Sequence, residues 1–351
     1  MIIQTVAQSR LGEKDFNELP FGSVYADHML VADYENNSWQ APKIVPFARM
    51  EMSPSLSALN YGQAIFEGMK AYVNDNGEAI TFRMNENYER MNRSAIRMCM
   101  PEIPEHIFVD GLKALLQLDN KWIPRQENAA LYIRPILFAT DEAVGVKPSD
   151  NYRFCIMTCQ IASYFKEPLK VLIEPEFIRS AQGGVGFAKA AGNYASAMYP
   201  TKLAQERGFH QIIWTDAAEH KYLEESGAMN LMLVINNVVI TPSLSDSKLA
   251  GVTRMSLLHI ARTWNMQVEE RLVSIEELIA AHTNNTLQEV FGVGTAANIA
   301  AIKMFHYNGV DYELPAITEN SFQIKGGGYL NQIKQGKTTD VFNWNTTIPV
   351  K

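Results

Sequence analysis

Apolar stretches bounded by turn residues predict β-strands in the first half of the chain. Two of these stretches, Gly68–Val73 and Ala79–Arg83, are separated by the turn residues Asn74-Asp75-Asn76-Gly77. The Asn-Gly step supplies the positive φ angles that a tight turn needs, so the pair is predicted to form a β-hairpin. The further strands predicted in this half are Ser23–His28, Ile44–Phe47, Ala129–Leu137 and Tyr152–Gln160.

Helices are predicted where apolar residues recur every three or four positions. In the first half these are Glu86–Arg97, with Asn85 as the predicted N-cap, and Ile107–Asp119. Strands joined by hairpins, together with helices, predict an α+β domain over residues 1–163.

Strands and helices alternate in the second half, which predicts a larger C-terminal domain of α/β character over residues 172–351. Its predicted strands are Lys170–Glu174, Gln211–Asp216, Met229–Ile235 and Val238–Thr241. Its predicted helices are Tyr194–Arg207, Val252–Trp264, Ile275–Ala281 and Ala296–Phe305. The polar segment that starts at Tyr164 contains a proline, and we expect an interdomain linker over residues 164–171. A chain of 351 residues is too long for one ordinary core, which agrees with two domains.

Composition and charge exclude several kinds of partner. The residues are 47% hydrophobic, enough for a sizeable core, and the net charge is −7 without a run of Lys or Arg, so nucleic acid is not expected as a partner. No stretch approaches the roughly 20 uninterrupted apolar residues that a membrane span needs. Residues 1–21 lack the basic and then apolar pattern of a secretory signal, and a cytoplasmic protein is expected.

The three cysteines do not suggest a disulfide framework. Cys155 and Cys159 are four residues apart in a predicted strand, which places their sulfur atoms on the order of 13 Å apart. They cannot share one metal ion, and we expect them to be buried small hydrophobic residues. No metal site is predicted.

Lys189 is the only charged residue between Ala181 and Thr201. Small and apolar neighbours disfavour the ammonium form, so we expect a free amine that can act as a nucleophile. The alternative is a glycine-rich surface loop with one exposed lysine. A phosphate-binding loop of the nucleotide hydrolases is excluded, because Ala188 and Ala190 flank the lysine.

Two further glycine-containing loops, Gly292–Ala297 and Ala250–Arg254, each precede a predicted helix. The first fits a loose dinucleotide-binding pattern, but too little chain follows Ala297 for the rest of such a fold. Backbone N–H groups at a helix N-terminus can still bind an anion. Together with a reactive lysine, two anion sites suggest a cofactor that carries both a phosphate and an aldehyde.

Short motifs in a fixed order extend over nearly the whole chain. They are Phe21–Met29, Tyr61–Tyr72, Phe82–Met91, Tyr132–Pro135, Gly183–Tyr194, Glu225–Asn230 and Phe291–Ala296. In sequence and order they resemble the motifs of the branched-chain amino acid aminotransferases, a family of fold-type IV pyridoxal-phosphate enzymes. The resemblance implies a two-domain fold similar to that of D-amino acid aminotransferase, pyridoxal 5′-phosphate as the cofactor, and a homodimer.

The resemblance also implies roles for the cofactor-binding residues. Lys189 matches the Schiff-base lysine, which also moves the proton during the reaction. Tyr194 matches the tyrosine that hydrogen-bonds the phenolic oxygen of the cofactor, and Glu225 matches the carboxylate that keeps the pyridine nitrogen protonated. Locally, Glu225 and its neighbour Glu224 would instead form a solvated pair at the end of a strand.

Arg90 matches the arginine that binds the cofactor phosphate, where a guanidinium can make two parallel hydrogen bonds. Val252, Thr253 and Thr295 join it from the two predicted helix N-termini. Arg179 resembles a further arginine near the cofactor.

On the substrate side, a branched aliphatic side chain needs an apolar pocket. The aromatic residues that match the pocket of the family are Phe21, Tyr61, Phe66, Tyr132 and Tyr164. Arg134 has two candidate roles: it could position the tyrosines, or it could bind the side-chain carboxylate of glutamate. Backbone groups around Thr295 and Ala296 are expected to bind the α-carboxylate.

These expectations predict reversible amino transfer between leucine, isoleucine or valine and 2-oxoglutarate in a two-stage ping-pong cycle. A D-amino acid aminotransferase or an aminodeoxychorismate lyase on the same fold is the nearest alternative. A non-catalytic relative that binds metabolites is the alternative of a different class.

Overall fold

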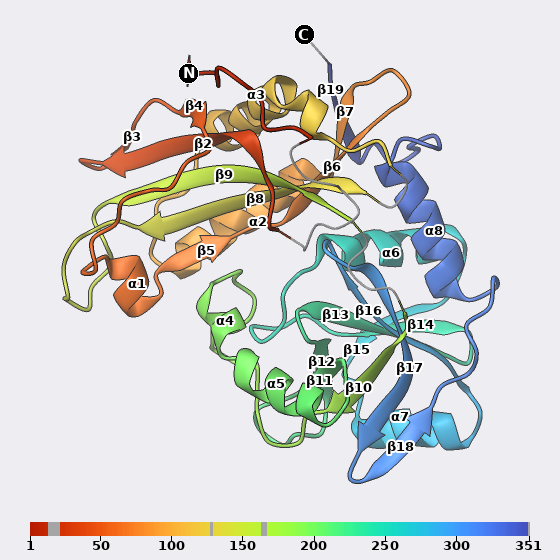
Figure 1. The fold of residues 1–351 in the computed structure, drawn as a ribbon. Helices are drawn as coiled ribbons and strands as arrows, with labels where there is room; N and C mark the ends of the chain where they lie inside the picture. The colour runs from red at the N-terminus through yellow and green to blue at the C-terminus, as the bar shows by residue number, and fades with distance from the viewer. Residues whose placement is uncertain (13–21, 127–128, 163–166, 350–351) are drawn as a thin grey trace. The chain divides into compact units, whose positions relative to one another are not determined.

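The computed structural model describes residues 1–12, 22–126, 129–162 and 167–349, and these residues form two compact units (Figure 1). Unit 1 consists of Met1–Tyr164, Ala188–Gly192 and Gln332–Lys351, and unit 2 of Phe165–Phe187 and Asn193–Asn331. The predicted division into 1–163, 164–171 and 172–351 differs from this, because the segment that contains Lys189 and the C-terminal segment belong to unit 1. Ala191 donates its N–H to Ala64 O at 2.9 Å, and the last strand pairs with an early one, so hydrogen bonding attaches both segments to unit 1.

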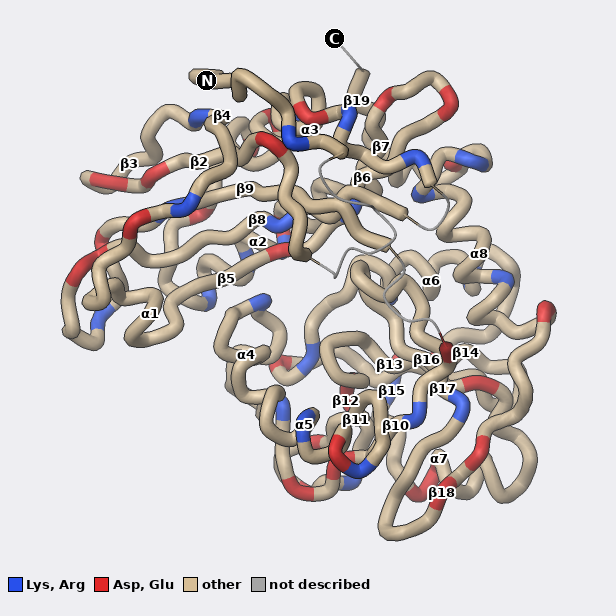
Figure 2. Tube along the Cα trace, in the orientation of Figure 1, with Lys and Arg blue, Asp and Glu red and all other residues tan. Residues whose placement is uncertain are grey.

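Charges of both signs are interspersed along the trace of each unit (Figure 2). No helix within the described ranges is long and apolar enough to cross a membrane.

Unit 1 is built on a mostly antiparallel sheet. Its strands are β1 (Ile2–Ile3), β2 (Tyr25–Glu35), β3 (Ser38–Trp39), β4 (Lys43–Pro46), β5 (Ala64–Phe66), β6 (Met69–Val73), β7 (Ala79–Phe82), β8 (Ala130–Ala139), β9 (Tyr152–Ile161) and β19 (Asn345–Ile348). In the part of the chain that is described, the main order is β1-β4-β2-β9-β8-β6-β7-β19, with β3 beside β2 and β5 beside β8. The predicted β6–β7 hairpin is confirmed, and Gly77 has the positive φ of 80° that its turn needs.

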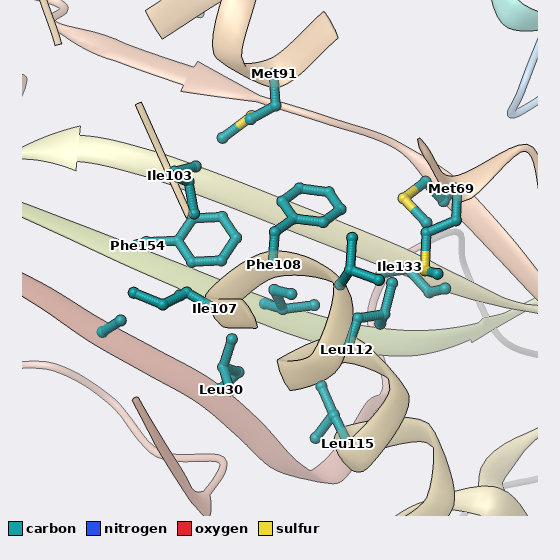
Figure 3. Close-up of a cluster of buried hydrophobic side chains, with 14 of the residues drawn as sticks. Leu30, Met69, Met91, Ile103, Ile107, Phe108, Leu112, Leu115, Ile133 and Phe154 are labelled. Atoms are coloured by element: carbon teal, nitrogen blue, oxygen red, sulfur yellow. The ribbon is translucent and has the colours of Figure 1, made fainter. Parts of the chain in front are cut away.

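Helices supply the other side of the unit 1 core. They are α1 (Ser57–Tyr61), α2 (Met84–Arg97), the π-helical turn η2 (His106–Asp110), α3 (Gly111–Leu118) and the 3₁₀ turn η3 (Asn120–Trp122). Phe108 of η2 stacks on Phe154 of β9 with ring centroids 5.7 Å apart, and both are fully buried (Figure 3). Each such side chain contributes on the order of 1.5–3 kcal/mol through burial. An added Cβ at Gly111 would lie 3.0 Å from Leu30 of β2, so the glycine allows α3 to approach the sheet closely.

The start of α2 differs from the prediction. The helix begins at Met84 and not after Asn85, and the residue at its N-cap is Arg83, with a positive φ of 47°. The predicted cap is therefore wrong, while the body of the helix is confirmed.

Unit 2 is built on a mixed sheet. Its strands are β10 (Leu169–Ile173), β11 (Gln211–Thr215), β12 (Leu223–Ser226), β13 (Met229–Ile235), β14 (Val238–Pro242), β15 (Val268–Arg271), β16 (Leu287–Gly294), β17 (Asn298–Tyr307) and β18 (Val310–Glu313). Among the residues described, the main order is β12-β11-β10-β17-β16-β13-β14-β15, with β18 beside β17. The helices are α4 (Gly192–Ala195), α5 (Met198–Glu206), α6 (Val252–Thr263), α7 (Ile275–Thr283) and most of α8 (Phe322–Lys334).

One helix prediction in this unit is wrong, and another is confirmed only in part. The segment Ala296–Phe305 is a turn followed by β17, which pairs with β16 on one side and β10 on the other. Its alanines favour a helix locally, but the pairing on both edges of a central strand overrides that preference. The predicted helix Tyr194–Arg207 is divided into α4 and α5.

Helix α8 was not predicted. Three consecutive glycines, Gly326 to Gly328, lie inside it, and glycine disfavours a helix interior. Its start is stabilised from a distant strand, because Phe322 and Gln323 donate their backbone N–H groups to the carboxylate of Glu289 at 2.5 and 2.9 Å. A cap supplied by another part of the chain leaves no local sequence signal.

Candidate functional site

The backbone of Lys189 is fixed by three elements of unit 1. Its carbonyl accepts a hydrogen bond from Phe66 N at 3.1 Å, and its N–H donates to Ser94 Oγ of α2 at 3.0 Å. The next residue, Ala190, forms a β-bridge with Ile65 of β5. The segment that carries the lysine is therefore held against β5.

The Lys189 side chain is partly buried, and its Nζ lies 4.9 Å from the centre of the Phe66 ring. Its sequence neighbours Ala188 and Ala190 are buried, as the apolar loop predicted. The tertiary neighbours are not all neutral, however, because the charge of Lys189 acts on the carboxylate of Glu67. The prediction of purely neutral surroundings is corrected on this point.

Glu67 is a site residue that the sequence did not reveal. It is fully buried, and Arg90 donates to it twice, from Nε to Oε1 at 2.7 Å and from Nη2 to Oε2 at 2.9 Å. Asn87 Nδ2 donates to Oε2 at 2.8 Å, and Gly68 N does so at 3.1 Å. Burial alone would raise the pKa of Glu67, but Arg90, Lys189 and Asn87 outweigh it and lower the pKa below its usual value. The available signal was one acid in the apolar stretch from Ala64 to Met69.

One face of α2 holds this arrangement together. Asn87, Arg90 and Ser94 recur at the three- and four-residue spacing that places side chains on the same side of a helix, and all three are buried. Arg90 was predicted from the family motif as a phosphate-binding residue. On the same helix, Asn87 donates to Glu67, the carboxylate partner of Arg90, and Ser94 Oγ accepts from the backbone N–H of Lys189.

A second cluster in unit 1 joins Arg134 to two aromatic rings. The guanidinium carbon of Arg134 lies 4.6 Å from the Phe66 ring centre and 5.3 Å from that of Tyr132. Arg134 Nη2 donates to the Tyr132 hydroxyl at 3.0 Å. This is the contact that one of the two predicted roles of Arg134, positioning a tyrosine, requires, and both roles stay predictions. Tyr61, at the end of α1, is 42% exposed in this chain.

Two predicted pocket residues, Phe21 and Tyr164, lie outside the described residues.

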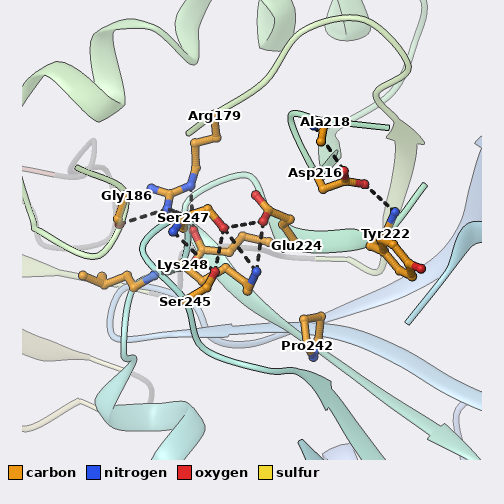
Figure 4. A network of polar contacts seen from close by, with 12 residues as sticks. Arg179, Gly186, Asp216, Ala218, Tyr222, Glu224, Pro242, Ser245, Ser247 and Lys248 are labelled. Carbon is orange, nitrogen blue, oxygen red and sulfur yellow. Dashed lines mark hydrogen bonds and ion pairs between the residues drawn. The ribbon is translucent and has the colours of Figure 1, made fainter. Parts of the chain in front are cut away.

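In unit 2, three groups converge on the Glu225 carboxylate of β12. Asn230 Nδ2 and Leu249 N donate to Oε1 at 2.9 and 3.0 Å. Arg179 Nε lies 2.8 Å from Oε2, which makes an ion pair, but its N–H is not aligned for a hydrogen bond. Arg179 Nη2 instead donates to the carbonyls of Gly186 and Ser247 (Figure 4).

Glu224 and Glu225 are both buried, so the local expectation of a solvated pair is wrong. Neighbouring residues of a strand face opposite sides, and each acid has a cation of its own. Glu224 accepts from Lys248 Nζ at 2.9 Å and from the Ser247 hydroxyl (Figure 4). The cation of Glu225 is Arg179.

The predicted anion site at α6 is a true helix start. Gly251 is the N-cap, and Val252 and Thr253 are the first, buried residues. An added Cβ at Gly251 would lie 1.9 Å from Asn230 Oδ1, so the glycine permits Asn230 to contact both Glu225 and the loop before α6.

The second predicted anion site is corrected. Thr295 and Ala296 lie in the hairpin turn between β16 and β17, where Gly294 pairs with Asn298, and not at a helix N-terminus. A hairpin turn has no helix dipole, so that part of the prediction does not apply.

Tyr194 is partly buried in α4.

Cys155 and Cys159 are buried strand residues, as predicted. Burial raises the pKa of Cys155 to about 12 and that of Cys159 to about 11. In the described part of the chain, no three His, Cys, Asp or Glu side chains are grouped to hold a metal ion.

A polar cavity of about 480 Å³ lies elsewhere in unit 1. Its lining includes Glu35, Glu51, Glu142 and Arg153, and it contains none of the predicted site residues. The candidate residues therefore form two groups, one around Lys189 in unit 1 and one around Glu225 in unit 2.

Comparisons with known proteins identify relatives along nearly the full chain. The sequence profile of the family described as class IV amino-transferases matches residues 64–305. Branched-chain-amino-acid aminotransferase 2 of Bacillus subtilis (strain 168) is 40% identical over 338 residues, which cover 95% of this chain and 93% of the relative. Branched-chain-amino-acid transaminase 1 of the same strain is 39% identical over 344 residues, which cover 95% of each chain.

Solved structures share the fold. The branched-chain aminotransferase of the archaeon Thermoproteus uzoniensis superposes with a TM-score of 0.76 at 24% identity, covering 92% of this chain and 100% of that one. The enzyme of Thermobaculum terrenum gives a TM-score of 0.75 at 19% identity, covering 92% and 98%.

Proposed function

Because this chain belongs to the branched-chain amino acid aminotransferases of the class IV aminotransferase family, we propose that it transfers the amino group of leucine, isoleucine or valine to 2-oxoglutarate with pyridoxal 5′-phosphate as the cofactor. The position of Lys189 carries the proposal. Its backbone is fixed by Phe66 and Ser94, and its amine lies beside the Phe66 ring.

The donor set fits this cofactor. Pyridoxal 5′-phosphate requires an amine for its aldehyde, cationic and backbone donors for its phosphate, and a carboxylate for its ring nitrogen. In unit 1, Lys189 offers the amine and Arg90 the cationic donor. In unit 2, Glu225 offers the carboxylate and the start of α6 at Thr253 offers the backbone donors. When bound, the cofactor supplies an aldehyde that condenses with amines and a ring that accepts electrons.

Each residue then has a definite task. Lys189 Nζ takes the proton from Cα of the substrate and returns it later in the cycle. Arg90 binds the phosphate with a guanidinium whose plane is fixed by Glu67. Glu225 would hold the ring nitrogen of the bound cofactor, and Asn230 and Leu249 fix its carboxylate by donating hydrogen bonds to it.

The substrate side chain lies against the aromatic surface of Phe66 and Tyr132, which suits leucine, isoleucine and valine. When glutamate is the donor, its side-chain carboxylate meets the guanidinium of Arg134. Backbone groups at Thr295 and Ala296 bind the α-carboxylate. Tyr61 adds to the aromatic lining in this proposal. A homodimer remains a prediction from the family resemblance, and a cytoplasmic location remains a prediction from the sequence of residues 1–21.

The test is a transamination assay with purified protein, leucine and 2-oxoglutarate, with D-alanine as the competing donor. We expect glutamate to form with leucine and not with D-alanine. Borohydride reduction and peptide mapping should find the cofactor on Lys189. Removing a positioned proton-transfer group typically costs 10²- to 10⁴-fold, so Lys189→Ala should lose at least about 10²-fold in rate.

The matched control is Lys202→Ala on the exposed side of α5, which should keep full activity. Undiminished transamination by Lys189→Ala would overturn the mechanism. Faster reaction with D-alanine than with leucine would replace the proposal by the D-amino acid alternative.

A further inference from the structure

Gly68 lies between β5 and β6, directly after Glu67, and is buried. An added Cβ at this position would lie 2.3 Å from the Tyr132 hydroxyl oxygen and 3.1 Å from Cζ of the same ring. Real Cβ atoms essentially never come within 3.0 Å of another heavy atom, so the 2.3 Å contact with the hydroxyl oxygen means that a side chain at position 68 would force Tyr132 to move. The Tyr132 hydroxyl can occupy its observed position because Gly68 has no side chain.

That hydroxyl is also the acceptor for Arg134. Tyr132 and Arg134 are two residues apart on β8, so they face the same side of the sheet. Arg134 Nη2 donates to the hydroxyl at 3.0 Å, and the guanidinium rests on the Phe66 ring at 4.6 Å. The Tyr132 side chain is buried, so it has little room to swing outward. Gly68 therefore determines the position of the Arg134 guanidinium through the Tyr132 hydroxyl.

The Arg134 guanidinium has the donor groups to bind an anion. Arg134 Nε is buried and has no hydrogen-bond partner among the described residues, and a buried donor without a partner is costly. A carboxylate that reaches this group would relieve that cost, whereas an aliphatic side chain would not.

We propose that Gly68 is a specificity-determining position that favours acidic substrates. Because it has no side chain, the Tyr132 hydroxyl can lie where it accepts a hydrogen bond from Arg134. This rests on the proposed function, in which Arg134 meets the side-chain carboxylate of glutamate and of 2-oxoglutarate. Gly68 acts through Tyr132 and is a positioning residue.

Gly68→Ala displaces the hydroxyl and removes its hydrogen bond with Arg134. A hydrogen bond to a charged group accounts for roughly tenfold or more in an equilibrium, so kcat/KM for glutamate should fall by about tenfold or more. Leucine has no side-chain carboxylate for the guanidinium but packs against Tyr132 in the proposed function, so its kcat/KM should fall by less than that for glutamate. The measured quantity is the ratio of kcat/KM for glutamate to that for leucine.

A double-mutant cycle separates this role from a general structural defect. Tyr132→Phe removes the clashing oxygen and leaves the ring carbon at 3.1 Å as the nearest atom. In the Tyr132→Phe background, Gly68→Ala should change the ratio by less than about twofold. Gly328→Ala in α8 is the matched control, because a Cβ there meets nothing within 4 Å, and it should leave the ratio unchanged. Cofactor absorbance and thermal unfolding are recorded for every variant.

An equal loss for both substrates in Gly68→Ala would overturn the inference, and so would a tenfold change of the ratio that persists with Tyr132→Phe. If Gly68→Ala alone does not fold, Tyr132→Phe is the test, because it removes the same hydrogen bond with Arg134. It should lower the ratio by about tenfold or more, and an unchanged ratio would overturn the inference. A wild-type protein without activity on leucine and glutamate would overturn the proposed function and this inference together. An active protein whose variants keep the wild-type ratio would overturn the inference alone.

Discussion

The carboxylate of Glu67 binds the guanidinium of Arg90 through two parallel hydrogen bonds of 2.7 and 2.9 Å, and both side chains are buried. A buried charge pair of this kind fixes geometry more than it adds stability, because both charges lose their hydration. In this chain the pair joins the turn after β5 to α2. The same two elements fix the backbone of Lys189 through Phe66 and Ser94.

Glu67→Gln should destabilise the protein and weaken its binding of cofactor. The variant leaves Arg90 buried without its counter-charge, and breaking one side of a buried pair costs about 3–5 kcal/mol. Urea unfolding measures the stability, and equilibrium titration with pyridoxal phosphate should show at least about tenfold weaker binding, the loss expected when a charged hydrogen-bond partner no longer holds Arg90. Glu89→Gln on the exposed side of α2, whose partner Arg93 is 3.6 Å away, is the control and should change little. Wild-type stability and affinity in Glu67→Gln would contradict the positioning role.

The contribution of Glu67 should depend on pH in a defined direction. Its pKa is lower in the folded protein than the usual 4.5, so the stability that it provides is fully present above that value. The contribution is lost as the pH falls from about 4.5 through the folded pKa. The difference in unfolding free energy between wild type and Glu67→Gln should therefore be constant near neutral pH and shrink in acid. A difference that grows on acidification would contradict this assignment.

Lys248→Met should be strongly destabilising, and a second change should rescue it. The single variant leaves Glu224 buried without its cation, which costs about 3–5 kcal/mol. Glu224→Gln combined with Lys248→Met removes both charges and should recover most of that loss in urea unfolding. If the double variant is as unstable as the sum of the two single variants, the pair is not coupled.

Only one of the three cysteines should react with iodoacetamide in the native protein at about pH 8, because the reagent needs an accessible thiol. Cys99 is exposed, whereas burial raises the pKa of Cys155 to about 12 and that of Cys159 to about 11. Mass spectrometry should find one label per chain on Cys99 and three after unfolding in urea. Rapid native labelling of Cys159 would show that β9 opens readily.

The sequence by itself determined the features that depend on neighbouring residues. The Asn-Gly step predicted the β6–β7 hairpin, and apolar spacing located the bodies of α2, α6 and β13. A lone lysine in an uncharged loop, with motifs in a fixed order, identified Lys189, Arg90 and Glu225 as candidates before any fold was known. Such signals are local, because φ angles, helical spacing and motif spacing are set within a few residues.

Only the tertiary structure decided which groups face one another. The alanine-rich segment before Tyr307 became β17 because strands lie on both sides of it, and α8 begins where Glu289, more than thirty residues away, caps it. The residues next to Glu67 did not predict its pairing with Arg90. Those next to Glu224 did not predict its pairing with Lys248. These relationships depend on strand pairing and packing between residues far apart in the chain, and the free energy of a buried charge is set by the partner that the fold brings to it.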